Sequence, residues 1–355
     1  MKIGIIADDL TGANDTGVKI AQKGIKTSVV FNLNQEAIGN LESIVYNTDS
    51  RYSEPKSAFD HVKQTAIFLK ENRFELIYKK MDSTLRGNIG VELDALYEVF
   101  NPDFIVIAPG YPECGRVLKE GQLYLNGKRL DQSEYANSPT DEGLEYDIMK
   151  KLSLQSKYKA ALFTKQDLND QIIYHKLNKK FKERVPYLVF DSVEENDLKM
   201  IAHYLSQSHY NILWAGSSGL INYLPAAYGI ETNKKSKKPL FSSSGQVGLP
   251  ALTVVGSFND VTLYQLKQLL KETSTHGFKM DIPRILESKE EKNNEINRIV
   301  TESLEKANSG YHVVLYASSE KEEVHQTLKI GKANGKNPSE VCSEITDTLG
   351  QMTKK

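Results

Sequence analysis

Two adjacent carboxylates at the end of an apolar run are the first residues of this sequence that could carry chemistry. The chain opens Met-Lys-Ile-Gly-Ile-Ile-Ala-Asp8-Asp9. The isoleucine-rich run predicts a buried strand of a parallel sheet, followed by a helix that begins near Ala13. Ligands of open α/β sheets bind outside the carboxyl ends of the strands, where carboxylates accept hydrogen bonds from hydroxyls or bind hard cations. The alternative is that Asp8 or Asp9 only caps the helix.

Two more polar segments follow predicted strands. Arg51 could bind a carboxylate through two parallel hydrogen bonds, although a surface arginine in a turn is the commoner case for such a residue taken alone. The segment at residues 79–88 brings cations, hydroxyls and an acid into one turn. Lys80 or Arg86 could supply charge to an anionic polyol, and Ser83 and Asp82 could bind its hydroxyls. Asp82 or Ser83 could instead cap a helix, but a cap does not need the cations, so binding is favoured.

Three turns rich in small residues are weaker signals. Residues 108–116 form a Gly/Pro-rich loop that either lines a site or simply connects two elements. Residues 215–220 form a turn that could bind a ligand or only allow close packing. Gly256 and Ser257 lie between a predicted strand and a predicted helix, where backbone N–H groups favour phosphate.

The composition excludes several classes of function. The formal net charge is -1, from 45 Lys and Arg against 46 Asp and Glu, which gives no footprint for nucleic acid or a membrane. The two cysteines lack metal or redox spacing, and no segment has the pattern of a signal peptide or a membrane span, so a cytoplasmic location is expected. The sequence has no P-loop, dinucleotide-binding or nucleophile-elbow motif. The seven histidines show no metal spacing, so any metal site stays unknown.

Strand-like runs alternate with amphipathic segments, which predicts an α/β protein of two domains, each a largely parallel sheet flanked by helices, with a cleft between them. Residues 1–231 form the first domain, 232–249 a basic and serine-rich linker, and 250–355 the second domain. The predicted strands after the first lie at residues 26–31, 43–47, 75–80, 103–108, 158–163, 187–190, 212–215, 251–255, 280–282 and 311–317. A hairpin with an Asn-Gly turn is predicted at residues 123–130.

Several of these motifs together closely resemble the four-carbon acid sugar kinase family, whose members include D-threonate, D-erythronate and 3-oxo-tetronate kinases. The resemblance is carried by residues 5–15, 47–51, 80–88, 108–116, 122–127 and 215–220, in the same order and spacing, and extends into the second domain as far as residue 262. It implies ATP-dependent phosphorylation of the terminal hydroxyl of a tetronate-like acid, with Mg²⁺.

The resemblance also implies roles for particular residues. Asp9, Arg51, Lys80, Met81, Asp82 and Ser83 correspond to the substrate site of the first domain, and Ser257 to a nucleotide contact of the second. The residue types themselves add Arg86 to the expected substrate site and Gly256 to the expected nucleotide contacts. Arg51 and Lys80 would neutralise the substrate carboxylate. An aspartate would accept the hydroxyl proton, with Asp9 favoured over Asp8 and Asp82.

The sequence departs from the family pattern at its end. Members of the family continue into a glycine-rich segment beginning Gly-Gly-Asp-Thr, whereas this sequence ends near that point. The nucleotide-binding domain is therefore expected to be incomplete at its C-terminus. This leaves two functions open: a tetronate-type kinase, or a catalytically impaired sugar-acid-binding protein on the same scaffold. The expected partners are small molecules, with no nucleic acid or membrane, and a second copy in a homodimer.

Overall fold

The computed structural model describes residues 1–33, 41–133, 145–168, 170–230, 249–257, 260–318 and 320–355. The chain divides into two compact units, Met1–Lys238 and Pro239–Lys355. The predicted linker at 232–249 lies outside the described residues except for its last residue. The two units are described separately below, and the predicted cleft between the two domains stays a prediction.

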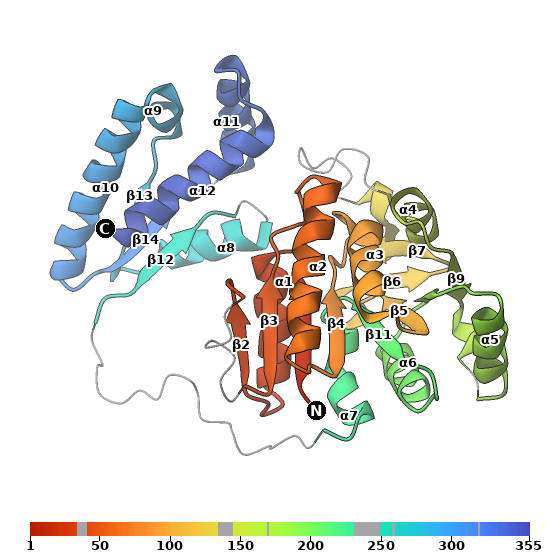
Figure 1. The fold of residues 1–355 in the computed structure, drawn as a ribbon. Helices are drawn as coiled ribbons and strands as arrows, with labels where there is room; N and C mark the ends of the chain where they lie inside the picture. The colour runs from red at the N-terminus through yellow and green to blue at the C-terminus, as the bar shows by residue number, and fades with distance from the viewer. Residues whose placement is uncertain (34–40, 134–144, 169, 231–248, 258–259, 319) are drawn as a thin grey trace. The chain divides into compact units, whose positions relative to one another are not determined.

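The first unit is built on a parallel sheet, as its apolar runs predict. In its described part, eight strands are hydrogen-bonded in one sheet, and every neighbouring pair is parallel (Figure 1). In sheet order the strands are β2 (Thr27–Val30), β3 (Ser43–Asn47), β1 (Ile3–Ala7), β4 (Leu76–Lys80), β11 (Ile212–Gly216), β5 (Phe104–Ala108), β10 (Tyr187–Phe190) and β9 (Ala160–Phe163). β1 lies between β3 and β4: β2 and β3 are on one side of it, and β4 and the later strands are on the other, so the strand order reverses at β1. Such a switch point is where open α/β sheets bind ligands.

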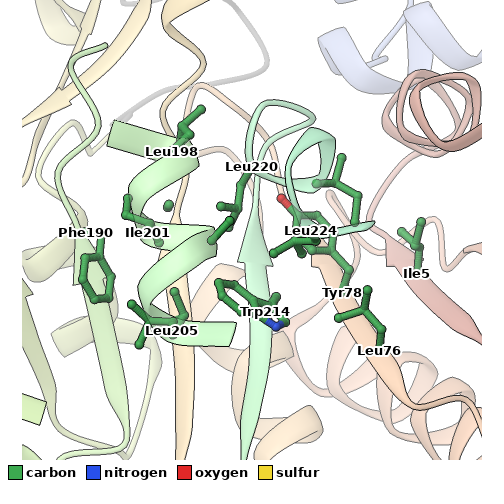
Figure 2. Close-up of a cluster of buried hydrophobic side chains, with 14 of the residues drawn as sticks. Ile5, Leu76, Tyr78, Phe190, Leu198, Ile201, Leu205, Trp214, Leu220 and Leu224 are labelled. Carbon is green, nitrogen blue, oxygen red and sulfur yellow. The ribbon is translucent and has the colours of Figure 1, made fainter. Parts of the chain in front are cut away.

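Successive residues of a strand point to opposite faces, so an apolar run makes both faces of the sheet apolar. Helices cover both of these faces. Ile3 and Ile5 belong to a core shared with α1 (Leu10–Ala21), α5 (Asp170–Lys182), α6 (Glu195–Ser206) and α7 (Leu224–Ala227). This core also holds the buried Trp214 and Tyr78 (Figure 2). Ile6 belongs to the opposite core, shared with α2 (Pro55–Glu71), α3 (Ile89–Phe100) and α4 (Ile148–Gln155).

A small antiparallel sheet follows the main strand β5. It consists of β6 (Arg116–Lys119), β7 (Gln122–Leu125) and β8 (Lys128–Arg129). Asn126 and Gly127 join β7 to β8 with φ values of 50° and 80°. Two successive positive φ values characterise the type I′ turn that Asn-Gly favours, so the predicted hairpin is confirmed.

The second unit is a smaller α/β structure. In its described part, β12 (Leu252–Val255), β14 (His312–Tyr316) and β13 (Thr275–Lys279) form a parallel sheet in that order. Its helices are α8 (Asp260–Leu269), α9 (Ile282–Glu287), α10 (Lys289–Asn308), α11 (Lys321–Ala333) and α12 (Pro338–Lys354). Apolar side chains of β14, α9, α10 and α12 share one core. The predicted fold class is thus confirmed for both units.

Two predicted boundaries are wrong. The first helix begins at Leu10 rather than near Ala13, because the Asp9 side chain accepts a hydrogen bond from the Gly12 N–H and caps the helix earlier. The strand expected at residues 280–282 is Thr275–Lys279, and Ile282 already starts α9. None of the helices in the described residues is both long and apolar enough to cross a membrane.

Candidate active site

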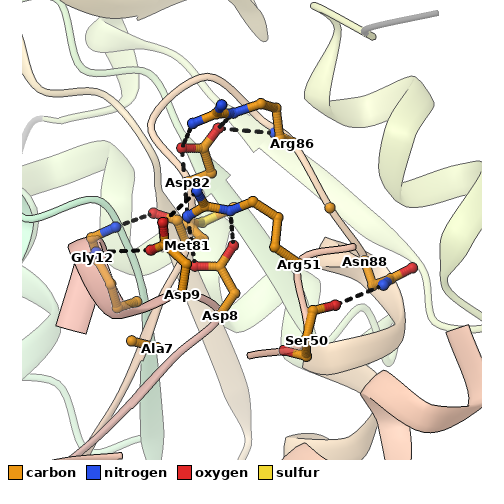
Figure 3. Close-up of polar contacts among 12 residues, drawn as sticks. Ala7, Asp8, Asp9, Gly12, Ser50, Arg51, Met81, Asp82, Arg86 and Asn88 are labelled. Carbon is orange, nitrogen blue, oxygen red and sulfur yellow. Dashed lines mark hydrogen bonds and ion pairs between the residues drawn. The ribbon is translucent and has the colours of Figure 1, made fainter. Parts of the chain in front are cut away.

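The acid pair at the end of β1 converges on one arginine. The Arg51 guanidinium donates to Asp8 through Nε (2.7 Å to Oδ2) and Nη2 (3.0 Å to Oδ1), and its Nη1 donates to Asp9 Oδ2 at 2.6 Å (Figure 3). The backbone reinforces the arrangement, since the Ser50 and Arg51 N–H groups both donate to the Asp8 carbonyl. Burial alone would lower the pKa of Arg51, but its hydrogen bonds to Asp8 and the surrounding carboxylates hold that pKa above its ordinary value. Arg51 is therefore no surface residue.

Asp9 is the N-cap of α1 and also pairs with Arg51. Its Oδ1 accepts a hydrogen bond of 2.8 Å from the Gly12 N–H at the start of α1, while its Oδ2 accepts from Arg51. Asp8 instead has both oxygens paired with Arg51 and is only 2% exposed. Of this pair, Asp9 is the carboxylate that lines a pocket.

Asp82 follows β4 and organises the next turn. Its oxygens accept from Arg86 Nε at 2.7 Å and Nη2 at 2.9 Å, and also from the Thr84 hydroxyl and N–H. Arg51 Nη2 lies 3.7 Å from Asp82 Oδ1. Burial alone would raise the pKa of Asp82, but the two arginines and the Thr84 hydroxyl hold it well below its usual range. Because α3 begins at Ile89, Asp82 and Ser83 do not cap that helix.

Lys80 ends β4 and faces α1. Its Nζ donates to the Met81 carbonyl at 2.8 Å, and a Cβ added to Gly12 would lie 2.8 Å from that Nζ. Burial lowers the pKa of Lys80, while the carboxylates of Asp8, Asp82 and Asp9 oppose that shift. The glycine at position 12 therefore provides the room in which the ammonium group and the Asp9 carboxylate sit.

These side chains line one pocket of about 330 Å³ in the first unit. Its lining residues include Asp9, Arg51, Lys80, Asp82, Ser83 and Arg86, that is, most of the residues predicted for the substrate site. Met81 is an exception, because its side chain is buried in the core next to α3 and only its carbonyl takes part, as the acceptor for Lys80. A small polar pocket with convergent charged groups can bind a hydroxylated anion.

The pocket also contains residues that the sequence argument did not single out. Thr11, Asp15 and Lys19 come from α1, Tyr111 and Cys114 come from the loop after β5, and Arg116 is the first residue of β6. The Gly/Pro-rich composition of that loop was the available signal, but on its own it is common to connectors. Arg116 is the last residue of the 108–116 motif, but the sequence argument gave it no role of its own.

A second charged cluster lies on the other face of β4. Lys79 Nζ is 2.9 Å from Glu92 Oε2 of α3, and both side chains are almost fully buried. Glu92 also accepts a hydrogen bond from the hydroxyl of Ser50, the residue before Arg51. Burial raises the pKa of Glu92, and the adjacent Lys79 ammonium opposes that rise. The cluster therefore ties α3 to the segment that presents Arg51.

The predicted nucleotide contacts belong to the second unit. Gly256 and Ser257 follow β12 and are exposed, and α8 begins at Asp260. Backbone at the end of a parallel strand and before a helix is thus accessible in this unit. Within the described part of the chain, no group of three or more His, Cys, Asp or Glu side chains is arranged to hold a metal ion.

Comparison with known proteins adds the family to this geometry. A model of the sugar-binding N-terminal domain matches residues 3–224, and a model of the nucleotide-binding C-terminal domain matches residues 252–355. The chain is also 28% identical to the D-threonate kinase of Salmonella typhimurium, over 99% of this chain and 80% of that protein. The chain belongs to the four-carbon acid sugar kinase family. The predicted family, and with it a phosphotransferase scaffold, is confirmed.

Other members of the four-carbon acid sugar kinase family also match most of this chain. The D-erythronate kinase of Heliobacterium modesticaldum is 28% identical over 99% of this chain and 79% of its own length. The 3-oxo-tetronate kinase of Haemophilus influenzae is 27% identical over 80% of this chain and 68% of its own length. These names differ in substrate at almost the same identity, so they do not select one acid.

Solved structures show the same fold. The Haemophilus influenzae protein HI1011 has a TM-score of 0.69 at 23% identity, covering 99% of this chain and 83% of that one. A Bordetella bronchiseptica protein, solved with bound citrate as a domain-swapped dimer, has a TM-score of 0.57 at 22% identity, covering 94% of this chain and 79% of that one. Both likenesses support the architecture of the family.

Proposed function

We propose that this chain is an ATP-dependent kinase that phosphorylates the terminal hydroxyl of a four-carbon sugar acid, a tetronate or 3-oxo-tetronate. The observation that carries the proposal is the convergence of Asp9, Asp82, Arg51, Arg86 and Lys80 on one pocket at a topological switch point, in a chain of this kinase family. The acids and hydroxyls of the pocket suit the hydroxyl groups of such a substrate, and its cations suit the negative charge.

Asp9 is the proposed base. It lines the pocket, whereas Asp8 is buried with both oxygens paired to Arg51. Asp82 is a poor proton acceptor, because its two arginine neighbours and Thr84 stabilise the charged form and lower its pKa. Asp9 would accept the hydroxyl proton as the phosphoryl group arrives, and its hydrogen bond to the Gly12 N–H would keep the carboxylate oriented.

The sequence predicts that Arg51 binds the substrate carboxylate, but in this proposal Arg51 has a different role. Its donors are already directed at Asp8 and Asp9, with Asp82 nearby, so a substrate carboxylate would have to displace one of these acids. Arg51 therefore orients the aspartates. It is a positioning residue for Asp9.

The nucleotide would bind the second unit, with Gly256 and Ser257 contacting its phosphates through the backbone and the hydroxyl. Mg²⁺ typically retains waters and is bound by one or two carboxylates together with substrate phosphates, so the scarcity of clustered ligands in the described residues is compatible with it. When bound with ATP, Mg²⁺ would offset charge on the transferring phosphoryl group. The predicted homodimer would be tested by measuring the mass of the protein in solution.

The test combines binding and turnover. A ligand that binds only the native state at 100 times its Kd stabilises the protein by about 2.7 kcal/mol, which raises its melting temperature. We expect such a shift with D-threonate, D-erythronate or a 3-oxo-tetronate, a second shift with ATP and Mg²⁺, and release of ADP when both are present. Hexonates, which are longer, and succinate, which lacks hydroxyls, are the matched controls.

The outcomes separate the candidate functions. A shift with a tetronate but no ADP release would support the alternative, a sugar-acid-binding protein on the same scaffold. No response to any four-carbon acid, with a folded protein, would show that the substrate class is wrong.

A further inference from the structure

Arg116 differs from the other two arginines of the pocket in what it contacts. Arg51 and Arg86 are each paired with aspartates at hydrogen-bond distance. Arg116 has no carboxylate within ion-pair distance among the residues that the structure describes. Its Nη1 donates to the Cys114 carbonyl at 3.1 Å, and its Nε is buried without a hydrogen-bond partner in the same set of residues. A buried guanidinium N–H without a partner is costly unless a ligand supplies the acceptor.

The backbone that carries Arg116 is held firmly. The Tyr111 N–H donates to the Arg116 carbonyl at 2.6 Å, and the Arg116 N–H donates back to Tyr111 at 3.1 Å. Gly115 between them has a φ of 69°, and its carbonyl accepts from the Asn126 N–H of the hairpin turn. Arg116 is thus placed at the pocket by two turns rather than by a free loop end.

The small-residue turn after β11 completes this support. The buried Ser217 hydroxyl donates to the Gly110 carbonyl at 2.8 Å. A Cβ added to Gly219 would lie 3.1 Å from that same carbonyl and 3.1 Å from the Tyr111 ring, so a larger residue would push the loop. The two glycine-rich segments at 108–116 and 215–220 therefore act together, and they place Arg116 at the pocket together with Tyr111 and Cys114.

The remaining pocket cations are less available. Lys80 donates to the Met81 carbonyl, and burial lowers its pKa. Lys19 Nζ lies 3.9 Å from Glu113 Oε2 and over the Tyr111 ring. A guanidinium matches a carboxylate through two parallel hydrogen bonds, and Arg116 is the pocket arginine that no acid occupies in the described residues.

We propose that Arg116 binds the carboxylate of the four-carbon acid and thereby sets which end of the substrate meets Asp9. The inference rests on the proposed function, because it takes a hydroxy acid as the ligand. With the carboxylate at Arg116, the hydroxyl end is left for the part of the pocket formed by Asp9 and Ser83. Arg116 is then a binding and specificity residue of the site.

The experiment measures the Kd of D-threonate and D-erythronate by calorimetry for wild type, Arg116→Gln and Arg116→Lys. A charge-assisted hydrogen-bonded pair corresponds to about a 10- to 100-fold change in affinity. We expect a loss of that size for Arg116→Gln and a partial recovery for Arg116→Lys. The control is Arg129→Gln, in β8 of the same small sheet, whose guanidinium pairs with Asp131 instead of lining the pocket.

The neutral amide of the same acid distinguishes a carboxylate contact from a structural role. Arg116→Gln should weaken the acid much more than the amide. Equal affinity of wild type and Arg116→Gln for the acid would overturn the inference, as would an equal loss for acid and amide or an equal loss in the Lys and Gln variants. If wild type itself binds no four-carbon acid, the proposed function fails, which is a separate result.

Discussion

Lys79 and Lys80 are neighbours at the end of β4, yet they serve opposite faces of the sheet. Lys80 points toward α1, where it joins Asp9 and Gly12 at the pocket. Lys79 points toward α3, where it pairs with Glu92 away from the pocket. Each face thus holds a lysine close to carboxylates, but the surroundings of these charges differ. On the α1 face the charges line a cavity that a ligand can enter, while on the α3 face they are satisfied by protein alone.

The difference suggests a division of labour. Residues of the α1 face would contribute to ligand affinity and turnover, with modest effects on folding. Residues of the α3 face would contribute to stability and to the placement of Arg51, since Glu92 accepts the hydroxyl of Ser50. The predictions below separate these two kinds of effect. The one tryptophan of the chain, Trp214, is buried in the first unit, so its fluorescence reports the unfolding of that unit.

The largest effect is expected for Asp9→Asn. Asparagine caps a helix about as well as aspartate, so α1 should keep its N-terminus. The amide cannot accept the hydroxyl proton, and loss of a general base lowers turnover by about 10²–10⁴-fold. The measurement is kcat for ADP release with the preferred tetronate, together with the melting temperature.

The control for this variant is Asp60→Asn, an exposed position of α2. Its turnover should equal that of wild type. Turnover of Asp9→Asn within threefold of wild type would remove Asp9 from the role of base.

On the α3 face, Lys79→Met should destabilise the first unit without touching the pocket. Removing one partner of a buried ion pair leaves the other charge uncompensated, at a cost of about 3–5 kcal/mol. The double variant Lys79→Met/Glu92→Leu removes both charges and should recover most of that loss. The free energy of unfolding is measured with denaturant by Trp214 fluorescence.

The exposed pair Lys63–Glu98 is the matched control, with N–O distance 2.8 Å. Lys63→Met should cost less than about 1 kcal/mol, as is usual for surface pairs. A double variant as unstable as Lys79→Met alone would mean that Lys79 and Glu92 do not act as a pair.

Two helical glycines probe the two faces with the same substitution. A Cβ at Gly12 would meet Asp9 Oδ1 at 2.7 Å and Lys80 Nζ at 2.8 Å, which are the ends of site side chains. A Cβ at Gly90 of α3 would meet Gln155 Cβ at 2.7 Å and the Gln155 backbone carbon at 2.9 Å. Gly12→Ala should therefore misplace the site and lower kcat/KM by about 10²-fold. Gly90→Ala should overpack the α3–α4 contact and cost about 1–3 kcal/mol.

The two variants control for each other. Gly12→Ala should unfold near the wild-type denaturant midpoint, because alanine favours a helix interior and the displaced groups are side-chain ends. Gly90→Ala should bind a tetronate normally while folded. If both variants lose stability equally and both keep the affinity for the acid, the contrast between the faces is wrong.

The sequence predicts much of this arrangement for a simple physical reason. Buried parallel strands are short apolar runs, and the residues that follow neighbouring strands must meet at one sheet edge. That logic places Asp9, Arg51 and Asp82 near one another before any coordinates are known. The Asn126-Gly127 hairpin is equally local, since the turn type selects those residues.

The sequence could not predict which charged residues far apart in the chain pair with one another. Lys79 and Glu92 look like two more surface charges in a sequence rich in them, and only the register of β4 against α3 buries them together. The partners of Arg51 depend on side-chain geometry, so the sequence could not tell an arginine that waits for a ligand from one already occupied by acids. For the same reason, the sequence could not predict that Arg116 lines the pocket without an acidic partner among the described residues.

The smallest effect is a pH dependence that comes from Asp82. Its pKa is well below the unfolded value because Arg86 and Arg51 stabilise the carboxylate, against the opposing effect of burial. A carboxylate with a depressed folded pKa stabilises the protein above its unfolded pKa, near 4, and that contribution is lost as the pH falls toward the folded value. Wild type should therefore lose about 1 kcal/mol more than Asp82→Asn between pH 5 and pH 3, because the amide does not titrate.

Trp214 fluorescence in denaturant at the two pH values measures this difference, and Asp60→Asn should follow the wild-type profile. The comparison uses the change with pH rather than the absolute stability, since Asp82→Asn also leaves both arginines without part of their partner. A profile for Asp82→Asn that runs parallel to wild type would mean that Asp82 binds its proton equally in the folded and unfolded chain. The arginines would then not hold its charge, and Asp82 would compete with Asp9 as the proton acceptor of the pocket.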